Sequence, residues 1–169
     1  MANQFEFNIP SFIDSEFYIS KLKKIKLKKL KIKLTNKKSR KISTYLPIEE
    51  TPHFSFVENY LLGKKERICL DYKNYKEYNE YNGHYLDEEN FKNLIDSIIS
   101  KGFQEKDSKI ICLKNFYNPF YGSFKVLDGS HRLAILLFLN FKDVNVAIAK
   151  HKKNFVKRKL NFLKKIYFN

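Results

Sequence analysis

Residues 126–137 read VLDGSHRLAILL, and this stretch sets a strand, a turn and a helix next to one another. The apolar run that ends at Leu127 is typical of a short strand. Gly129 indicates a tight turn, because glycine adopts backbone conformations that other residues avoid. The apolar residues that follow the turn, up to Asn140, predict a helix. The stretch therefore predicts a strand that leads directly into the N-terminus of a helix.

The start of that helix is a candidate anion-binding site. The N–H groups of a first helical turn have no intrahelical acceptor and carry a partial positive charge, which suits a phosphate group. His131 and Arg132 add side-chain donors at the same end. An acidic residue beside a phosphate is costly unless it binds Mg²⁺ or handles a proton, so Asp128 is a candidate catalytic and metal-binding residue. The alternative is an aspartate that caps the helix, with the His and Arg side chains packed on the surface.

The segments on either side of the turn predict a compact α+β domain, because short helices and strands follow one another in segregated order. Thr51 and Asp87 are expected helix N-caps, and Gly63 and Gly102 end the two helices. The first helix is expected to bury one stripe of Phe54, Val57 and Leu61. The expected elements are helices over 52–62 and 88–101, and strands over 66–70, 109–113, 123–127 and 143–149, with 109–127 forming a hairpin.

Two basic segments produce the formal net charge of +15. Residues 21–41 hold 12 Lys and Arg and no Asp or Glu, and residues 150–169 hold 8 and none. We therefore divide the chain into an N-terminal segment with a basic arm (1–41), a globular domain (42–149) and a basic amphipathic C-terminal helix (150–169). In residues 21–34 the spacing of apolar residues fits a helix in one half and a strand in the other.

The role of the basic segments stays open at this point. A basic amphipathic helix is typical of an anchor on an anionic membrane surface, and it is equally typical of a helix docked on the protein's own core. Lys-rich segments also bind the phosphate backbone of nucleic acids. Only two arginines, Arg40 and Arg158, lie in these segments, and arginine is the usual base-reading residue.

Composition excludes several classes of protein. A chain of 169 residues has room for one domain, and 43% hydrophobic with 16% aromatic residues is too apolar for a disordered protein. No apolar run reaches the roughly 18 residues of a membrane span, and the start lacks the pattern of a secretory signal. Cys69 and Cys112 are too few for a disulfide framework, so we expect two reduced thiols and a cytoplasmic protein. This expectation leaves room for peripheral contact with the inner membrane surface.

Residues 87–149 resemble the ParB/sulfiredoxin superfamily in the order of their elements and in the turn Asp128-Gly129-Ser130-His131-Arg132, which matches its DGxHR form. The resemblance implies a ParB/sulfiredoxin-like fold with a small mixed sheet. It also implies a nucleotide-phosphate cradle made by Gly129, Ser130, His131 and Arg132. In the kinase branch, which is similar to free-serine kinases, the aspartate of the turn is catalytic, and Asp128 inherits that role.

Departures from the superfamily patterns narrow the branch. Sulfiredoxins carry a nucleophilic cysteine where this chain has Ser130, and ParB partition proteins carry a further helix-turn-helix domain and an Arg-Arg turn. The kinase branch also has an early catalytic glutamate, for which Glu50 is the best match and Glu49 the second. His53 follows at the start of a helix and could contact phosphate or acceptor, or be a partly exposed helix-start histidine.

The function predicted from the sequence is therefore an ATP-dependent kinase that uses Mg²⁺ and phosphorylates a hydroxyl of a sugar or lipid-linked glycan. The glycan rests on a loose likeness of residues 51–54, the Tyr-rich segment and the turn to ParB-like proteins of surface-polysaccharide biosynthesis. Tyrosines recur every three residues from Tyr72 to Tyr81, either as a platform for sugar rings or as a packed aromatic stripe. The alternatives are a nucleotide-dependent nucleic-acid binder and a binding module without chemistry.

Overall fold

The computed structural model describes residues 11–35, 43–63, 72, 86–105, 109–114 and 122–152. These residues form an α+β structure built on one six-stranded mixed sheet with the strand order β1-β6-β4-β5-β2-β3. The β4–β6 and β2–β5 pairs are parallel, and the other three pairs are antiparallel. The strands are β1 (Phe17–Lys26), β2 (Leu30–Thr35), β3 (Ser43–Pro47), β4 (Ile110–Lys114), β5 (Phe124–Asp128) and β6 (Asp143–His151).

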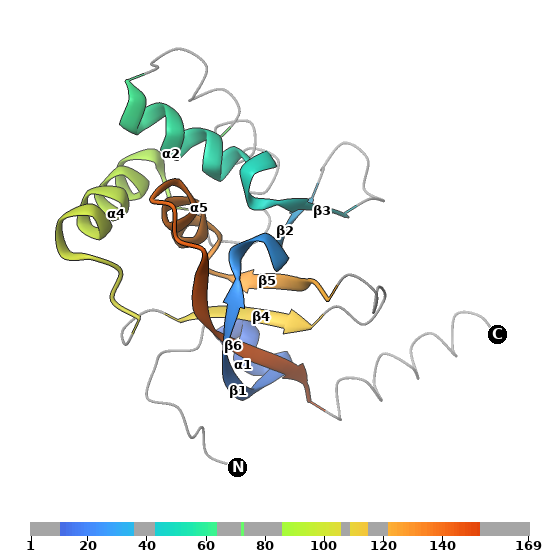
Figure 1. The fold of residues 1–169 in the computed structure, drawn as a ribbon. Helices are drawn as coiled ribbons and strands as arrows, with labels where there is room; N and C mark the ends of the chain where they lie inside the picture. The colour runs from blue at the N-terminus through green and yellow to red at the C-terminus, as the bar shows by residue number, and fades with distance from the viewer. Residues whose placement is uncertain are drawn as a thin grey trace.

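Helices cover both faces of the sheet, unequally. Three of them, α2 (Pro52–Leu62), α4 (Glu88–Lys101) and α5 (Ser130–Phe138), lie together on one side, and the short α1 (Ser11–Glu16) lies on the other (Figure 1). The larger core lies under α2, α4 and α5 and includes Ile110 and Val146 of the sheet. The smaller core lies under α1, where Ile13 packs with Phe17 and Ile19 of β1 and with neighbouring residues of β4 and β6.

A three-residue 3₁₀ turn, η1 (Leu27–Lys29), connects β1 to β2 and forces the sheet to curl. In the sheet order β1 and β2 are four strand spacings apart, about 19 Å if the sheet were flat. Four peptide steps span at most about 14 Å even when fully extended. The Lys23 ammonium lies 5.9 Å from the centre of the Phe124 ring, although two strands separate β1 from β5 in the sheet. The sheet is therefore strongly curled, with the larger core on its inner side.

The structure corrects the prediction of a basic N-terminal arm for the part of that segment that it describes. Residues 17–35 are two strands of the sheet, one paired with β6 and the other with both β5 and β3. The strand interpretation is confirmed for the second half of residues 21–34, and the helical interpretation of the first half is wrong, because residues 21–26 belong to β1. The 3₁₀ turn η1 separates the two halves and explains the change in apolar spacing. Apolar side chains hold the segment to the core while its lysines face solvent. The buried residues of the segment are Phe17, Ile19, Ile25, Leu27, Leu30 and Ile32.

The predicted caps of the first helix are confirmed, but its buried face is rotated. The Thr51 hydroxyl accepts a hydrogen bond from the Phe54 N–H and donates one to the Ile48 carbonyl, and Gly63 ends α2 with φ of 69°. The fully buried face carries His53, Phe56, Val57 and Asn59, whereas Phe54 and Leu61 are only partly buried. The difference arises because α2 turns His53 and Phe56 toward a group of rings formed by Tyr72, Phe91 and His131.

The elements from residue 87 onward agree with the sequence. Asp87 caps α4 by accepting a 2.7 Å hydrogen bond from the Asn90 N–H, and β4 and β5 pair as the expected antiparallel hairpin. Cys112 lies in β4 as a buried free thiol, and burial raises its pKa. The C-terminal helix expected over 150–169 is wrong at its start, because residues 150 and 151 belong to β6. The rest of it from residue 153, Cys69, the strand expected over 66–70 and the tyrosines after Tyr72 lie outside the described residues.

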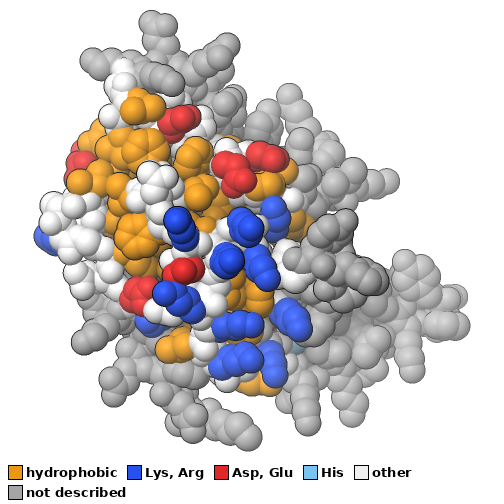
Figure 2. Space-filling model, viewed as in Figure 1, with side chains coloured by type: hydrophobic (Ala, Val, Ile, Leu, Met, Phe, Trp, Pro, Cys, Tyr) orange, Lys and Arg blue, Asp and Glu red, His pale blue; other side chains and the backbone are white. Residues whose placement is uncertain are grey.

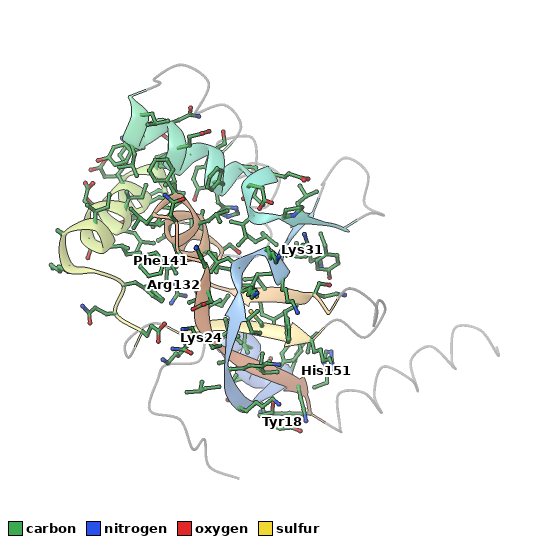
Figure 3. The ribbon with its side chains drawn as sticks, in the orientation of Figure 1. Tyr18, Lys24, Lys31, Arg132, Phe141 and His151 are labelled. Atoms are coloured by element: carbon green, nitrogen blue, oxygen red, sulfur yellow. The ribbon has the colours of Figure 1, made fainter. Side chains whose placement is uncertain are left out.

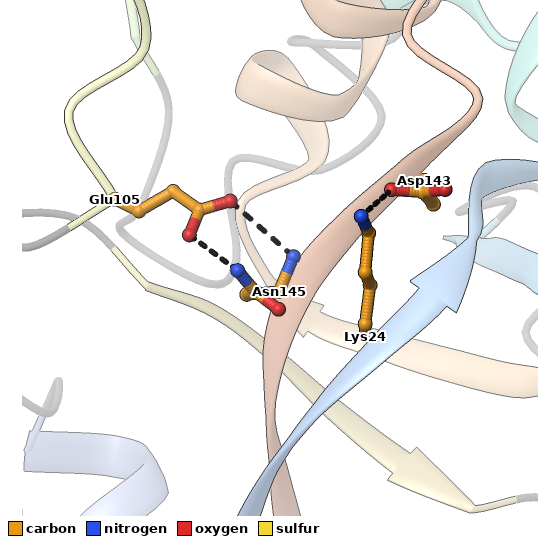
Figure 4. Close-up of polar contacts among 4 residues, drawn as sticks. All are labelled: Lys24, Glu105, Asp143 and Asn145. Atoms are coloured by element: carbon orange, nitrogen blue, oxygen red, sulfur yellow. Dashed lines mark hydrogen bonds and ion pairs between the residues drawn. The ribbon is translucent and has the colours of Figure 1, made fainter.

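Polar contacts fasten the end of the α4 segment to β6. The Glu105 carboxylate accepts a 2.6 Å hydrogen bond from the Asn145 side-chain amide and a longer one from the Asn145 backbone N–H (Figure 4). On the adjacent edge of β6, Asp143 pairs with Lys24 of β1 at 2.9 Å. The hydrogen bond to Asp143 and its negative charge are the main causes that raise the pKa of Lys24. None of the described helices is long and apolar enough to cross a bilayer.

Leu30→Ala tests whether the lysine-rich segment is part of the folded sheet. Leu30 is fully buried, so we expect the substitution to lower the free energy of unfolding by about 2–5 kcal/mol. Leu22→Ala is the matched control in the same segment, because Leu22 is 45% exposed and its loss is expected to cost no more than about 0.5 kcal/mol. Urea denaturation of both variants measures the two changes in the free energy of unfolding. Equal, small losses would show that the segment is a flanking arm and not part of the folded sheet.

Candidate functional site

The turn between β5 and α5 is built around Gly129, which is the N-cap residue of α5. Its φ of 98° lies in the left-handed region, and its carbonyl accepts a 2.9 Å hydrogen bond from the Leu133 N–H. A Cβ at this position would lie 2.9 Å from Ile110 Cγ1 and 3.3 Å from Ile110 Cα. Glycine is therefore required twice, once by backbone conformation and once by the close approach of β4.

Asp128 and Arg132 form an ion pair across this turn, one helical turn apart. The Arg132 guanidinium donates to Asp128 Oδ2 at 2.8 Å and to the Lys109 carbonyl oxygen at 3.5 Å. The Arg132 side chain is 16% exposed and that of Asp128 is 33% exposed. The pair holds Arg132 in place, and the carboxylate of Asp128 remains open to solvent on part of its surface.

The imidazole of His131 points toward the aromatic residues at the edge of the larger core, and the residue is half-buried. Its Nε2 lies 2.6 Å from the Tyr72 hydroxyl, and its ring packs edge-on against Phe91 with ring centres 4.6 Å apart. Tyr72 also donates its hydroxyl hydrogen to the Leu86 carbonyl oxygen at 2.9 Å, since a carbonyl can only accept. With the single hydroxyl hydrogen used there, His131 donates from Nε2 to the Tyr72 oxygen. This assigns the neutral ring to the tautomer with its proton on Nε2.

A second histidine, His53, meets His131 at this place. The two rings contact edge to face with centres 4.6 Å apart. Burial, reinforced by the positive charge of Arg132, lowers the pKa of His131 to about 3. Burial, reinforced by His131, lowers the pKa of His53 well below its ordinary value. Both imidazoles are therefore neutral at physiological pH, and neither supplies a positive charge to a ligand.

The contact between the two rings brings together the starts of α2 and α5. His53 is the second residue of α2 and His131 the second residue of α5, so the two helices begin next to each other. The 3₁₀ turn η2 (Ile48–Glu50) leads into α2 and carries Glu49 and Glu50 on its exposed side. Two helix N-termini, which both favour negative charge, thus lie near the carboxylates of Asp128, Glu49 and Glu50.

The structure brings together two pairs of the predicted residues and leaves Glu49 and Glu50 apart from them. It brings His53 into contact with His131, and it pairs Asp128 with Arg132. Glu49 and Glu50 lie at the start of α2, and within the described part of the chain they form no hydrogen bond or ion pair with the turn. Ser130 is half-buried at the first position of α5. The groups at the turn that can reach a phosphate are the first N–H groups of α5 and the guanidinium of Arg132, because His131 is directed inward.

A metal ion would have one carboxylate at this turn. Among the described residues, no group of three or more His, Cys, Asp or Glu side chains could hold a metal ion. Mg²⁺ is commonly bound by one or two carboxylates together with the phosphates of a substrate and water, so Asp128 fits that mode without a preformed cage.

Sequence reasoning missed two residues that position the turn. Tyr72 is fully buried and orients His131, so the packed-stripe interpretation holds at this tyrosine. Ile110 is the neighbour that excludes a side chain at position 129. The spacing of tyrosines gave no sign that one of them reaches the turn, and only the fold brings β4 against Gly129.

Comparisons with protein-family models, with curated proteins and with solved structures found no match to this chain.

Gly129→Ala tests the close approach of β4 to the turn. The substitution adds a strained left-handed residue and an atom at 2.9 Å from Ile110, so we expect a loss of about 2–5 kcal/mol in the free energy of unfolding. Gly63→Ala is the matched control, because Gly63 has φ of 69° with no atom within 4 Å of the added Cβ. It is expected to lose only about 1–2 kcal/mol in the same urea titration. Equal losses would show that backbone conformation alone requires Gly129.

His131→Phe tests the neutral, buried state of the histidine. The folded protein keeps His131 neutral while the unfolded chain takes up a proton below about pH 6.5, so stability is complete above that pH and falls as the pH decreases toward 3. Between pH 7.5 and 5.0 the variant should lose roughly 2 kcal/mol less stability than the wild type. Urea denaturation at the two pH values measures both losses, and identical losses would contradict the assignment.

Proposed function

We propose that this chain is an ATP-dependent kinase that transfers phosphate to a hydroxyl of a sugar or lipid-linked glycan. The observation that carries the proposal is the meeting of the α2 and α5 N-termini at the His53–His131 contact. A phosphotransferase needs electropositive groups for the phosphates and a carboxylate for the hydroxyl proton within one site. The two helix starts supply the first, and Asp128 with Glu49 and Glu50 supplies carboxylates beside them.

In this proposal the first turn of α5 and Arg132 bind the phosphates. Backbone N–H groups at a helix start are fixed donors, and they need no rearrangement when the ligand arrives. Arg132 is already oriented by Asp128 and by the Lys109 carbonyl, and two of its five N–H groups serve these contacts. The remaining donors can bind phosphate oxygens. His131 acts as a positioning residue, because its bond to Tyr72 anchors the start of the helix in the core.

The carboxylates handle the acceptor hydroxyl. The hydroxyl oxygen forms a bond to the terminal phosphorus of ATP, the bond from that phosphorus to ADP breaks, and the hydroxyl proton passes to a carboxylate. Asp128 is the residue proposed for this proton and for Mg²⁺, which when bound neutralises charge on the phosphates. Glu50, with Glu49 second, would orient the acceptor from the start of α2. The choice of a glycan as acceptor rests on the sequence resemblance alone.

Asp128→Asn tests the kinase. With ATP and Mg²⁺ and a panel of monosaccharides and lipid-linked oligosaccharides, we expect the wild type to form ADP only when an acceptor is present. The variant should lose at least about 100-fold in that rate, because it loses the proton acceptor. ATP should still raise its melting temperature, because the N–H groups of α5 are unchanged.

Asp143→Asn is the matched control for the loss of an ion pair. Asp143 is the first residue of β6 and pairs with Lys24 at 2.9 Å, and it has no part in the proposed site, so the rate of the variant should stay within about twofold of the wild type. If neither ATP nor another nucleotide shifts the melting temperature of the wild type, the kinase proposal fails. If nucleotide binds and changes affinity for duplex DNA, and Asp128→Asn leaves both effects intact, the nucleic-acid binder replaces the kinase.

A further inference from the structure

The segment that forms β1, η1 and β2 carries eight lysines between residues 21 and 33 and no acidic residue between residues 17 and 35. We call these eight side chains the lysine surface. Within the described parts of the chain, Lys24 is the only one of them that forms an ion pair, with Asp143. Six more are exposed and Lys31 is half-buried. The lysine surface is Lys21, Lys23, Lys24, Lys26, Lys28, Lys29, Lys31 and Lys33.

Along β1 these lysines alternate between the two faces of the sheet: Lys23 lies over the ring of Phe124, whereas Lys24 pairs with Asp143. β1 is an edge strand, and the 3₁₀ turn η1 projects between it and β2. Figure 2 shows Lys and Arg side chains gathered over the part of the molecule where β1, η1 and β2 lie in Figure 1. Figure 3 shows Lys24 and Lys31 on the same side of the molecule, from the two strands that η1 connects. The lysines therefore belong to the folded sheet rather than to a flanking tail.

Exposed apolar side chains accompany the lysine surface. Leu22 lies within it and is 45% exposed. Phe141 is 44% exposed and lies in the loop between α5 and β6. The Leu27 N–H donates a 3.0 Å hydrogen bond to the Lys142 carbonyl, which places that loop directly beside η1. A basic surface with an exposed leucine and phenylalanine is thus fixed by the sheet and by this hydrogen bond.

We propose that the lysine surface, with Leu22 and Phe141, docks on an anionic phospholipid bilayer. The ammonium groups would lie at the lipid phosphates, and the two apolar side chains would enter the interface between headgroups and acyl chains. The positive charge of the lysine surface favours a polyanionic partner. The exposed apolar side chains favour an anionic bilayer over other polyanions. A nucleic-acid backbone offers an aliphatic side chain such as Leu22 no apolar phase, whereas the interface of a membrane does. The proposed contact is peripheral.

This inference does not depend on the proposed kinase. It rests on charge, exposure and the position of the loop at Phe141, whereas the kinase rests on the starts of α2 and α5. Failure of phosphotransfer would leave membrane docking in place, and failure of docking would leave phosphotransfer from ATP to a soluble acceptor in place.

The test is co-sedimentation of the full chain with vesicles. Vesicles of phosphatidylcholine with 30% phosphatidylglycerol are compared with vesicles of phosphatidylcholine alone, and we expect sedimentation only with the anionic vesicles, weakening as salt is raised. Lys28→Glu/Lys29→Glu on η1 should reduce the affinity by at least about tenfold. Lys92→Glu/Lys101→Glu on α4 makes the same change in net charge away from the lysine surface and should reduce the affinity by less than about threefold. Thermal melting of each variant verifies that it is folded.

Phe141→Ser separates a bilayer from a nucleic acid. It should weaken binding to the anionic vesicles about threefold or more, because it removes the side chain that enters the interface. It should leave the salt dependence unchanged. Three results would overturn the inference: no sedimentation with anionic vesicles, equal losses for the two double variants, or tighter binding to a 30-base-pair duplex than to vesicles at equal phosphate concentration with no effect of Phe141→Ser.

Discussion

The connection of β1 to β2 by three residues is the constraint on which the rest of the structure depends. It joins strands that are four spacings apart in the sheet, so the sheet has to curl around its larger core. Leu27 is fully buried in that connection and bonds to the loop after α5. The curl leaves one concave face for α2, α4 and α5, and it brings the starts of α2 and α5 together over the end of β5. The lysines of the connection remain on the outside.

Because both histidines are neutral, the side-chain positive charge at the turn comes from Arg132 and not from a histidine. His131 anchors the start of α5 through Tyr72 and the aromatic rings around it. Its imidazole is neutral there, so it offers no positive charge to a ligand. The positive character at the turn then comes from the helix start and from Arg132, which Asp128 already orients. In the proposed phosphate site the donors would be rigid, because they are backbone groups and one guanidinium that is already paired. The same pairing leaves a single, partly exposed carboxylate for chemistry.

Both proposals use separate parts of one molecule. The turn lies at the end of β5, and the lysine surface lies along β1, η1 and β2, with β2 next to β5 in the sheet. A peripheral protein whose basic surface and turn share one rigid sheet would keep a fixed orientation between lipid and ligand. Basic residues spread along a flexible tail could not supply that, because a tail does not fix the position of the domain.

The sequence by itself determined the local elements and the turn. Thr51 and Asp87 predict helix caps and Gly129 predicts a turn, because each acts through its nearest neighbours in the chain. The hairpin and the final strand are predicted by the alternation of apolar and polar residues. It left open whether residues 21–34 are a helix or a strand, because lysine suits both and the apolar spacing changes at η1. Only the tertiary structure decided that this segment belongs to the sheet, that His131 faces Tyr72, and that His53 lies beside it. These are contacts between residues 59 or more positions apart, or hydrogen bonds between distant strands, and no local pattern records which partner the chain will find.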